Sequence, residues 1–452
     1  MKRSLIILLV LIFVALSACS PTPTQMTTPT ATSTRRPATR TPIPSPTPSP
    51  TPLPAVEITE LRLLPAMQAG DWRVFGLITN RSETVMIHPR LAITVVDNHG
   101  NVLASDNVPI IFEQLAPGET SPFRAEFPGI GVASNVQAEL STTQTGSLQR
   151  AALEVEITSA VRTTRGGIAI LGSITNPDIT PASIAAFAVL AQDNNDRTLG
   201  IALPSALPGR ILGGETAPFL AILEIDSGAF SYEAYIDAVA AVTLLDPQPI
   251  TLDGSPRLKL DSQNHPIAIG NIKNDSDESY MASIMLTISY QDAWVTVSQI
   301  DTPIPLAPGE SRAFTATEFP GLSAKLPEGS WSLQDLVLVA RIDPLGVGSE
   351  VSQASPLDLE ILSYEPLGAF AFIRGTVTNP YANHVRNASI MTNLRYSWGE
   401  VVTAAWVVAA DSLAPGESAD FVLPVPIPAE SDPRNTEFDT WAAGVQIESD
   451  PN

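Results

Sequence analysis

Two short phrases recur four times in this 452-residue chain, always in the same order, and they constrain its fold more than any other feature. The first phrase runs from a Gly to an Asn with Ile or Val midway: Gly76–Asn80, Gly172–Asn176, Gly270–Asn274 and Gly375–Asn379. The second runs from Gly-Glu to a Phe: Gly118–Phe123, Gly214–Phe219, Gly309–Phe314 and Gly416–Phe421. Between 35 and 38 residues separate each Asn from the next Gly-Glu glycine. Such regularity indicates four tandem copies of one domain.

The spacing inside the phrases predicts β-strands. In the first phrase the Gly, the Ile or Val and the Asn occupy alternate positions, so they share one face of a strand, and the mostly polar residues between them face water. A glycine inside a strand marks the close approach of another group, and we expect a bulky side chain from the facing sheet to cover it. In the second phrase the Gly suits a turn with positive φ, and the Phe anchors the next strand in the core.

The first copy shows the whole pattern. Its β-rich runs are Val56–Leu64, Trp72–Thr79, Met86–Val96, Asn101–Ala104, Phe123–Phe127 and Val136–Thr142. Turn residues separate these runs, and no useful length of sequence has a helical period. The pattern predicts an all-β fold in which each copy is a β-sandwich of about seven strands.

The first copy also resembles a known family. After the first phrase come the hairpin Val95–Leu103, with the turn Asp97-Asn98-His99-Gly100, and then the second phrase. In this order of motifs the first copy resembles the FxLYD-type and related immunoglobulin-like domains of bacterial surface lipoproteins. The third and fourth copies have Gln291–Ala293 and Tyr396–Gly399 in place of the Asp-Gly turn, so there the resemblance rests on the two phrases. It implies a two-sheet fold with a scaffold or binding role, and it supplies no active-site residues.

The N-terminus predicts a lipid anchor. Met1-Lys2-Arg3 is a positive start, Leu5–Leu16 is an apolar run of signal-peptide length, and Leu16-Ser17-Ala18-Cys19 resembles the lipobox of bacterial lipoproteins. Cys19 is the only cysteine. We therefore expect cleavage before Cys19 and acylation of its thiol, which would attach the protein to a membrane outside the cytoplasm. The alternative is an ordinary secretory signal with an incidental cysteine.

Residues 20–54 are almost wholly Pro, Thr, Ser and Ala, and they predict a disordered, stiff linker. At ~3.1 Å per residue it would span up to roughly 100 Å. The predicted domains are the signal peptide 1–19, the linker 20–54, and β-sandwich repeats 1 to 4 at residues 55–146, 153–246, 250–344 and 357–452. Short junctions between the repeats predict a semi-rigid rod.

Charge and motifs exclude several function classes. Residues 1–54 contain no acidic residue, so the remainder, with 20 basic against 47 acidic residues, carries a formal charge of −27. We expect no nucleic-acid partner, because nothing could neutralise phosphates along a face. The four histidines are scattered, and no catalytic motif is present. We predict no catalytic residues, no cofactor and no metal site, although the acidic loops Asp193–Asp196 and Asn274–Glu278 leave calcium as an alternative.

The resulting prediction is a lipid-anchored, non-enzymatic surface protein for binding, adhesion or spacing. The alternatives are a carbohydrate-binding lipoprotein assisting a secreted hydrolase, and an enzyme with its site in a domain-end loop. Any protein or glycan partner is expected at repeat 4, which is the richest in aromatic residues: Tyr364, Tyr381, Tyr396, Trp398, Trp406 and Trp441. Exposed Trp and Tyr suit stacking on sugars, whereas buried Trp is the more ordinary arrangement.

Overall fold

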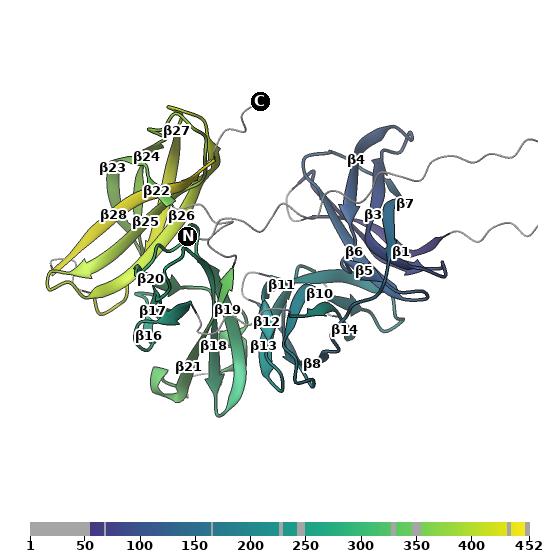
Figure 1. Cartoon of the computed structure of the whole chain (residues 1–452), viewed down its shortest axis with the longest axis horizontal. Coiled ribbons are helices and arrows are strands. Elements are labelled where there is room, and N and C mark those ends of the chain that lie inside the picture. The colour runs from purple at the N-terminus through teal and green to yellow at the C-terminus, as the bar shows by residue number, and fades with distance from the viewer. Residues whose placement is uncertain are drawn as a thin grey trace, which may run out of the picture. The chain divides into compact units, whose positions relative to one another are not determined.

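The computed structural model describes residues 55–66, 69–163, 166–225, 229–241, 249–326, 331–345, 354–431 and 435–447 (Figure 1). The predicted signal peptide, Cys19 and the linker lie outside the described residues, as do residues 242–246 at the end of predicted repeat 2 and residues 247–248 and 346–353 of the predicted junctions.

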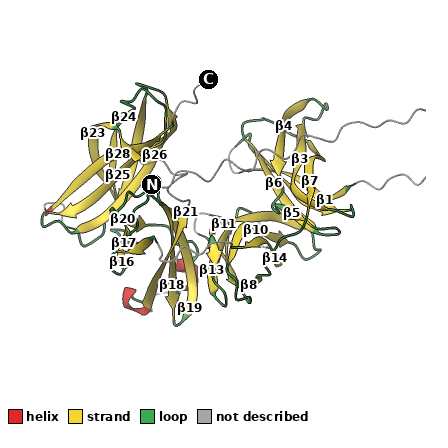
Figure 2. Cartoon of the chain, viewed as in Figure 1, coloured by secondary structure: helices red, strands yellow, loops and turns green. Residues whose placement is uncertain are grey.

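The regular secondary structure of the described chain is almost entirely β-strand (Figure 2). Repeat 1 contains β1 (Val56–Pro65), β2 (Trp72–Asn80), β3 (Val85–Val96), β4 (Val102–Pro109), β5 (Gln114–Leu115), β6 (Thr120–Phe127) and β7 (Asn135–Gly146). Repeat 2 contains β8 (Glu154–Arg162), β9 (Ile168–Thr175), β10 (Ala182–Gln192), β11 (Thr198–Ala206), β12 (Arg210–Ile211), β13 (Thr216–Leu223) and β14 (Ser231–Ala240).

Repeats 3 and 4 follow the same plan. Repeat 3 contains β15 (Ile250–Leu252), β16 (Arg257–Leu260), β17 (Pro266–Asn274), β18 (Met281–Tyr290), β19 (Ala293–Asp301), β20 (Ser311–Ala316), the short helix α1 (Leu322–Lys325), a 3-10 turn (Leu333–Asp335) and β21 (Leu336–Leu345). Repeat 4 contains β22 (Ala354–Pro356), β23 (Asp358–Leu367), β24 (Phe370–Thr378), β25 (Val385–Tyr396), β26 (Val401–Leu413), β27 (Ser418–Pro426) and β28 (Thr436–Gln446).

The strand ladders are antiparallel and group into sandwiches. In repeat 1 the sheet β1-β2-β6 faces a sheet in which β3 pairs with β4, β5 and β7, and the core lies between them. Repeats 3 and 4 have the same two-sheet arrangement, and in repeat 2 β11 pairs with strands of both sheets and so joins them. The prediction of an all-β fold of tandem sandwiches is confirmed. Contacts between the sandwiches join residues 53–452 into one compact unit, so the division into four independent domains stays a prediction.

The two repeated phrases lie on neighbouring strands. Each glycine of the first phrase is directly opposite the Phe of the second, as in the pairs Gly172 with Phe219 and Gly270 with Phe314. The four Phe rings are nearly or fully buried, and the four Gly-Glu glycines have positive φ, as expected. The ring that covers the glycine therefore comes from the adjacent strand of the same sheet, and our expectation of a residue from the facing sheet was wrong. An aromatic ring that packs over a glycine on the neighbouring strand also helps to fix the register between the two strands.

The asparagine that ends the first phrase joins it to the second. Asn80 is fully buried, and its Nδ2 donates to the carbonyl oxygens of Thr84 at 2.8 Å and Leu115 at 2.9 Å. Its backbone carbonyl accepts from Gly118, and its backbone N–H donates to Glu119. Asn176, Asn274 and Asn379 make the equivalent bonds. Each Gly-Glu turn is thereby held at a fixed place beside the end of the first phrase.

Gly172→Ala should lower the free energy of unfolding of repeat 2 by about 1 to 3 kcal/mol, the usual range for overpacking a core. A Cβ on Gly172 would lie 2.5 Å from the Phe219 ring and would press on the backbone oxygen of Glu156, which cannot move like a side chain. The control is Gly209→Ala in the same repeat, where a Cβ meets nothing within 4 Å. Denaturant unfolding measures both variants, and equal stabilities would contradict the packing argument.

No helix among the described residues is long and apolar enough to cross a membrane.

Candidate functional site

The glutamate of the second phrase has one constant role and one variable role. In every repeat its Oε2 accepts a hydrogen bond from the backbone N–H three residues earlier, which closes the Gly-Glu turn. The donor and acceptor pairs are Ala116 with Glu119, Leu212 with Glu215, Ala307 with Glu310 and Ala414 with Glu417, at 2.7 to 2.8 Å. The other oxygen, Oε1, is left for a second partner, and that partner differs between repeats.

In repeat 1 the second partner is Arg150, which lies in the connection to repeat 2. Its guanidinium binds Glu119 and the carbonyl oxygen of Gln114, and its Nε donates to Asp237 of β14 at 2.8 Å. The ring of Phe112 lies 4.6 Å below the guanidinium. Burial alone would lower the pKa of Arg150, but its hydrogen bonds to Asp237 and Glu119 outweigh burial and raise that pKa above its ordinary value. One arginine thus ties the turn of repeat 1 to a fully buried carboxylate of repeat 2.

In repeat 2 the second partner comes from repeat 3. Arg341 of β21 binds Glu215 and the carbonyl oxygen of Arg210, while its Nε donates to Asp343 at 3.1 Å. The Asp343 carboxylate in turn accepts from the backbone N–H of Gly209 at 3.2 Å, as Asp237 accepts from Gln114 at 3.1 Å. The first two junctions therefore use the same chemistry, an arginine held between a turn glutamate of one repeat and an aspartate of the next.

Repeats 3 and 4 depart from this pattern. In repeat 3 the partner is internal, because Arg312 binds Glu310 at 2.6 Å and the carbonyl oxygens of Ile304 and Pro305 at 2.7 and 3.0 Å. In the described part of repeat 4 no arginine reaches Glu417. Across the third junction the Thr315 hydroxyl lies 3.1 Å from that of Thr403, and Arg257 and Lys259 of repeat 3 form ion pairs with Glu400 and Glu430 of repeat 4.

The aromatic residues of repeat 4 divide into two groups. Trp406 and Trp441 pack against a cluster made of Ile304 of repeat 3 with Met391 and Ala443 of repeat 4, so they belong to the third junction. The Tyr381 hydroxyl donates to the carbonyl oxygen of Pro356 at 2.7 Å and secures the start of repeat 4. These three side chains make structural contacts, so for them the structural interpretation holds rather than the sugar-binding one.

Tyr396 and Trp398 form a stack at the hairpin between β25 and β26. Their ring centroids are 4.3 Å apart with an interplanar angle of 12°, and Trp398 is 65% exposed. The indole Nε1 donates to Glu400 at 3.4 Å, and Glu400 also accepts from Arg257 of repeat 3 at 3.1 Å. Hydrogen bonds from Trp398 and then from Arg257 lower the pKa of the Glu400 carboxyl. The Trp398 indole is thus held by a ring on one face and a carboxylate at its edge.

A second pair of stacked rings lies near the first pair along the strands of repeat 4. Tyr364 and Phe438 have ring centroids 5.2 Å apart at 20°, and Tyr364 is 45% exposed. Phe438 pairs with Leu394 across the sheet, two residues before Tyr396. Because alternate residues of a strand share a face, Tyr396 and Phe438 lie on the same face of the sheet, near one end of this strand pair.

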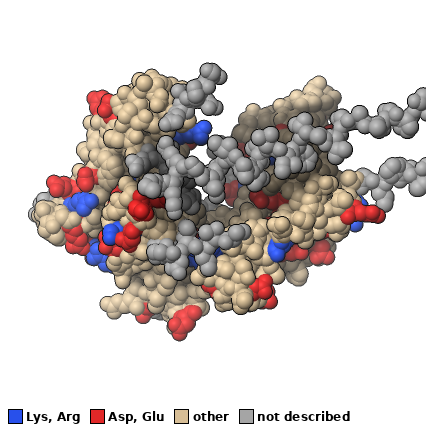
Figure 3. Space-filling model, viewed as in Figure 1, with Lys and Arg blue, Asp and Glu red and all other residues tan. Residues whose placement is uncertain are grey.

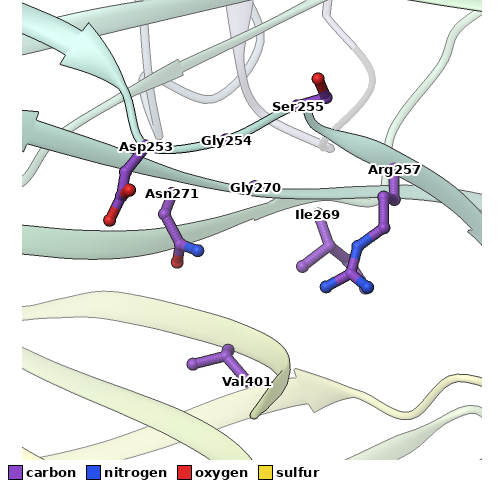
Figure 4. A pocket seen from close by; sticks show the side chains of 8 residues that line it. All are labelled: Asp253, Gly254, Ser255, Arg257, Ile269, Gly270, Asn271 and Val401. Carbon is purple, nitrogen blue, oxygen red and sulfur yellow. The ribbon is translucent and has the colours of Figure 1, made fainter.

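Two pockets lie beside β16. The first has a volume of about 240 Å³ and forms where β15 and β16 are separated (Figure 4). It is lined by Asp253, Gly254, Ser255, Arg257, Ile269, Gly270, Asn271 and Val401. Its charged groups are already engaged, since Arg257 binds Glu400 and Asp253 accepts from the Ser311 hydroxyl at 3.3 Å. The second, of about 600 Å³, is lined by five leucines, Pro256, Arg257 and Lys259 of repeat 3 and by Ala429 and Glu430 of repeat 4, and its Lys259 forms an ion pair with Glu430.

Charge is spread rather than gathered. Acidic and basic side chains are interspersed over the face seen in Figure 3. Among the described residues no three His, Cys, Asp or Glu side chains are grouped so that they could hold a metal ion. In the loop Asp193–Asp196, the Asp193 carboxylate accepts from the backbone N–H groups of Asn195 and Arg197 at 2.8 and 3.0 Å, so it closes its own turn.

Sequence reasoning placed the exposed aromatic residues in repeat 4 but missed the junction arginines. Arg150 precedes its aspartate by a whole repeat, whereas Arg341 is two residues from Asp343. No common sequence spacing connects the two junctions. The repeated glutamate was the only sequence signal that pointed to these junctions. Because its hydrogen bond within the Gly-Glu turn already accounts for its recurrence, nothing in the sequence required an arginine partner.

No protein-family model and no curated protein matches this sequence. Among solved structures, the chain is similar to a tetra-tandem repeat in the extending region of a large adhesion protein, with 11% identity, a TM-score of 0.12, and coverage of 84% of this chain and 96% of that one. It is also similar to native Escherichia coli alpha-2-macroglobulin, with 11% identity and a TM-score of 0.12, covering 86% of this chain and 29% of that one. The resemblance to FxLYD-type domains is therefore not confirmed by these comparisons.

Proposed function

We propose that the protein is a lipid-anchored, extracytoplasmic and non-enzymatic array of immunoglobulin-like repeats that serves surface binding, adhesion or spacing. The observation that carries the proposal is the pair of arginine junctions, because they repeat one linking chemistry between successive sandwiches. Arg150 and Arg341 restrict movement between neighbouring repeats, which favours a chain that holds its parts at set distances. The charged side chains that line the two pockets support this proposal, because they already form ion pairs or hydrogen bonds with other residues of the protein.

The anchor rests on the sequence of the leader. A charged start, an apolar run and the single cysteine coincide at Leu16–Cys19. One acyl chain gives only marginal membrane binding, whereas two or more give stable anchoring. A diacylglycerol on Cys19 would therefore hold the repeats at the membrane through the Pro/Thr-rich segment.

Cys19→Ser should move the protein from the membrane fraction to the soluble fraction. Serine has no thiol to acylate, and the repeats contain no other cysteine. Cell fractionation with immunoblotting measures the change, and Ser20→Ala beside the same position is the matched control. Membrane association that survives Cys19→Ser would refute the lipid anchor.

A second candidate is a carbohydrate-binding lipoprotein that assists a secreted hydrolase. The exposed stack of Tyr396 and Trp398 favours it over a purely spacing role.

A further inference from the structure

We propose that the stacked pair Tyr396 and Trp398 is a binding site for an uncharged glycan, whose sugar ring lies on the free face of the Trp398 indole. This inference deepens the surface-binding role proposed above and rests on it. Figure 1 shows β25 and β26, the two strands that the hairpin joins.

The indole is positioned before any ligand arrives. One face lies on Tyr396 at 12° to its ring plane, and the Nε1 edge donates to Glu400. The hairpin turns at Gly399, whose φ of 94° is a conformation that favours glycine. A side chain fixed in advance loses little conformational freedom on binding, so more of the contact energy appears as affinity.

The exposure of Trp398 is not explained by packing. Large aromatic side chains are usually well buried, and this one is 65% exposed even though Tyr396 covers one of its faces. Its free face is flat and apolar, which matches the C–H face of a pyranose ring. Glu400 and Arg257 stand at its edge with hydrogen-bonding capacity beyond their mutual contact, and sugar hydroxyls can both donate and accept.

Size and charge narrow the ligand to an uncharged glycan. A stable protein interface buries about 1,000 Å² or more, whereas this platform offers one indole face and its polar edge. The repeats carry a formal charge of −27, so a polyanionic glycan would be repelled. An uncharged sugar is small enough to bind on one indole face, and the negative charge of the repeats does not repel it.

The test measures binding of the full chain, solubilised in detergent, to the uncharged polysaccharides laminarin, arabinoxylan and mannan by affinity electrophoresis. We expect at least one of them to retard the wild-type protein and Trp398→Ala to weaken that binding by about tenfold or more. Trp398→Phe should restore part of the affinity, because it keeps a ring. Phe230→Ala in repeat 2 is the matched control, since Phe230 is 75% exposed and lies on a different repeat.

Three outcomes would overturn the proposal: no retardation by any of the three polysaccharides, equal binding by Trp398→Ala, or tighter binding to the polyanion heparin. Because Trp398 is exposed, unchanged thermal unfolding of Trp398→Ala shows that a lost signal is not lost folding. The anchor is judged separately by fractionation of Cys19→Ser, so failure of glycan binding leaves the lipid-anchored array standing. Membrane retention of Cys19→Ser would refute the anchor without touching the glycan result.

Discussion

Phe314→Ala is expected to lower the free energy of unfolding of repeat 3 by about 3 to 5 kcal/mol, the usual range for truncating a buried phenylalanine. The Phe314 ring is fully buried, it covers Gly270 on the neighbouring strand, and it packs in the core with Ile272 and Leu286. Alanine would leave a cavity over a glycine that has no side chain to fill it. Denaturant unfolding followed by tryptophan fluorescence measures the loss.

The matched control is Phe230→Ala, the same substitution at an exposed position, which should change stability by no more than about 0.5 kcal/mol. A Phe314→Ala variant as stable as the control would contradict the core role of the second phrase. Because Met285 and Val297 of repeat 3 pack on Leu171 and Leu220 of repeat 2, we also expect the unfolding transition of repeat 2 to shift.

The fold was largely predictable because its main determinants are local. Alternation of side chains identifies the core face of a strand, and the glycine of each Gly-Glu turn has the positive φ that the turn requires. The order of strands in a sheet is not local. Period-two patterning shows that Gly270 and Phe314 both face the core, but it does not show that their strands are adjacent, which is why the covering ring was assigned to the wrong sheet.

The candidate site was less predictable for the same reason. Trp398 lies in the turn Tyr396–Gly399 and is exposed, whereas Trp406 lies in an apolar run and packs against a cluster that contains Ile304 of another repeat. The local sequence indicates the turn, but it does not show that residues of repeat 3 pack against Trp406. The burial of Arg150 likewise depends on Asp237, which is 87 residues away in the chain.

Arg150→Ala is expected to destabilise the protein by about 3 to 5 kcal/mol, the usual effect of removing one partner of a buried ion pair. The side chains of Arg150 and Asp237 are 17% and 1% exposed. Without the guanidinium, the Asp237 carboxylate would stay buried and, among the described residues, would keep the hydrogen bond from the backbone N–H of Gln114. Urea unfolding should show the loss, with repeats 1 and 2 unfolding as less strongly coupled units.

The control is Arg81→Ala in repeat 1, which removes an exposed ion pair with Glu57 and should lower stability by at most about 1 kcal/mol. The double variant Arg150→Met with Asp237→Asn removes both charges, so it should recover much of what Arg150→Ala loses, because no uncompensated charge stays buried. If Arg150→Ala were no more harmful than Arg81→Ala, the arginine would not join the repeats. A double variant no more stable than Arg150→Ala would instead show that the contacts to Glu119 and Gln114, rather than compensation of Asp237, supply the stabilisation at this junction.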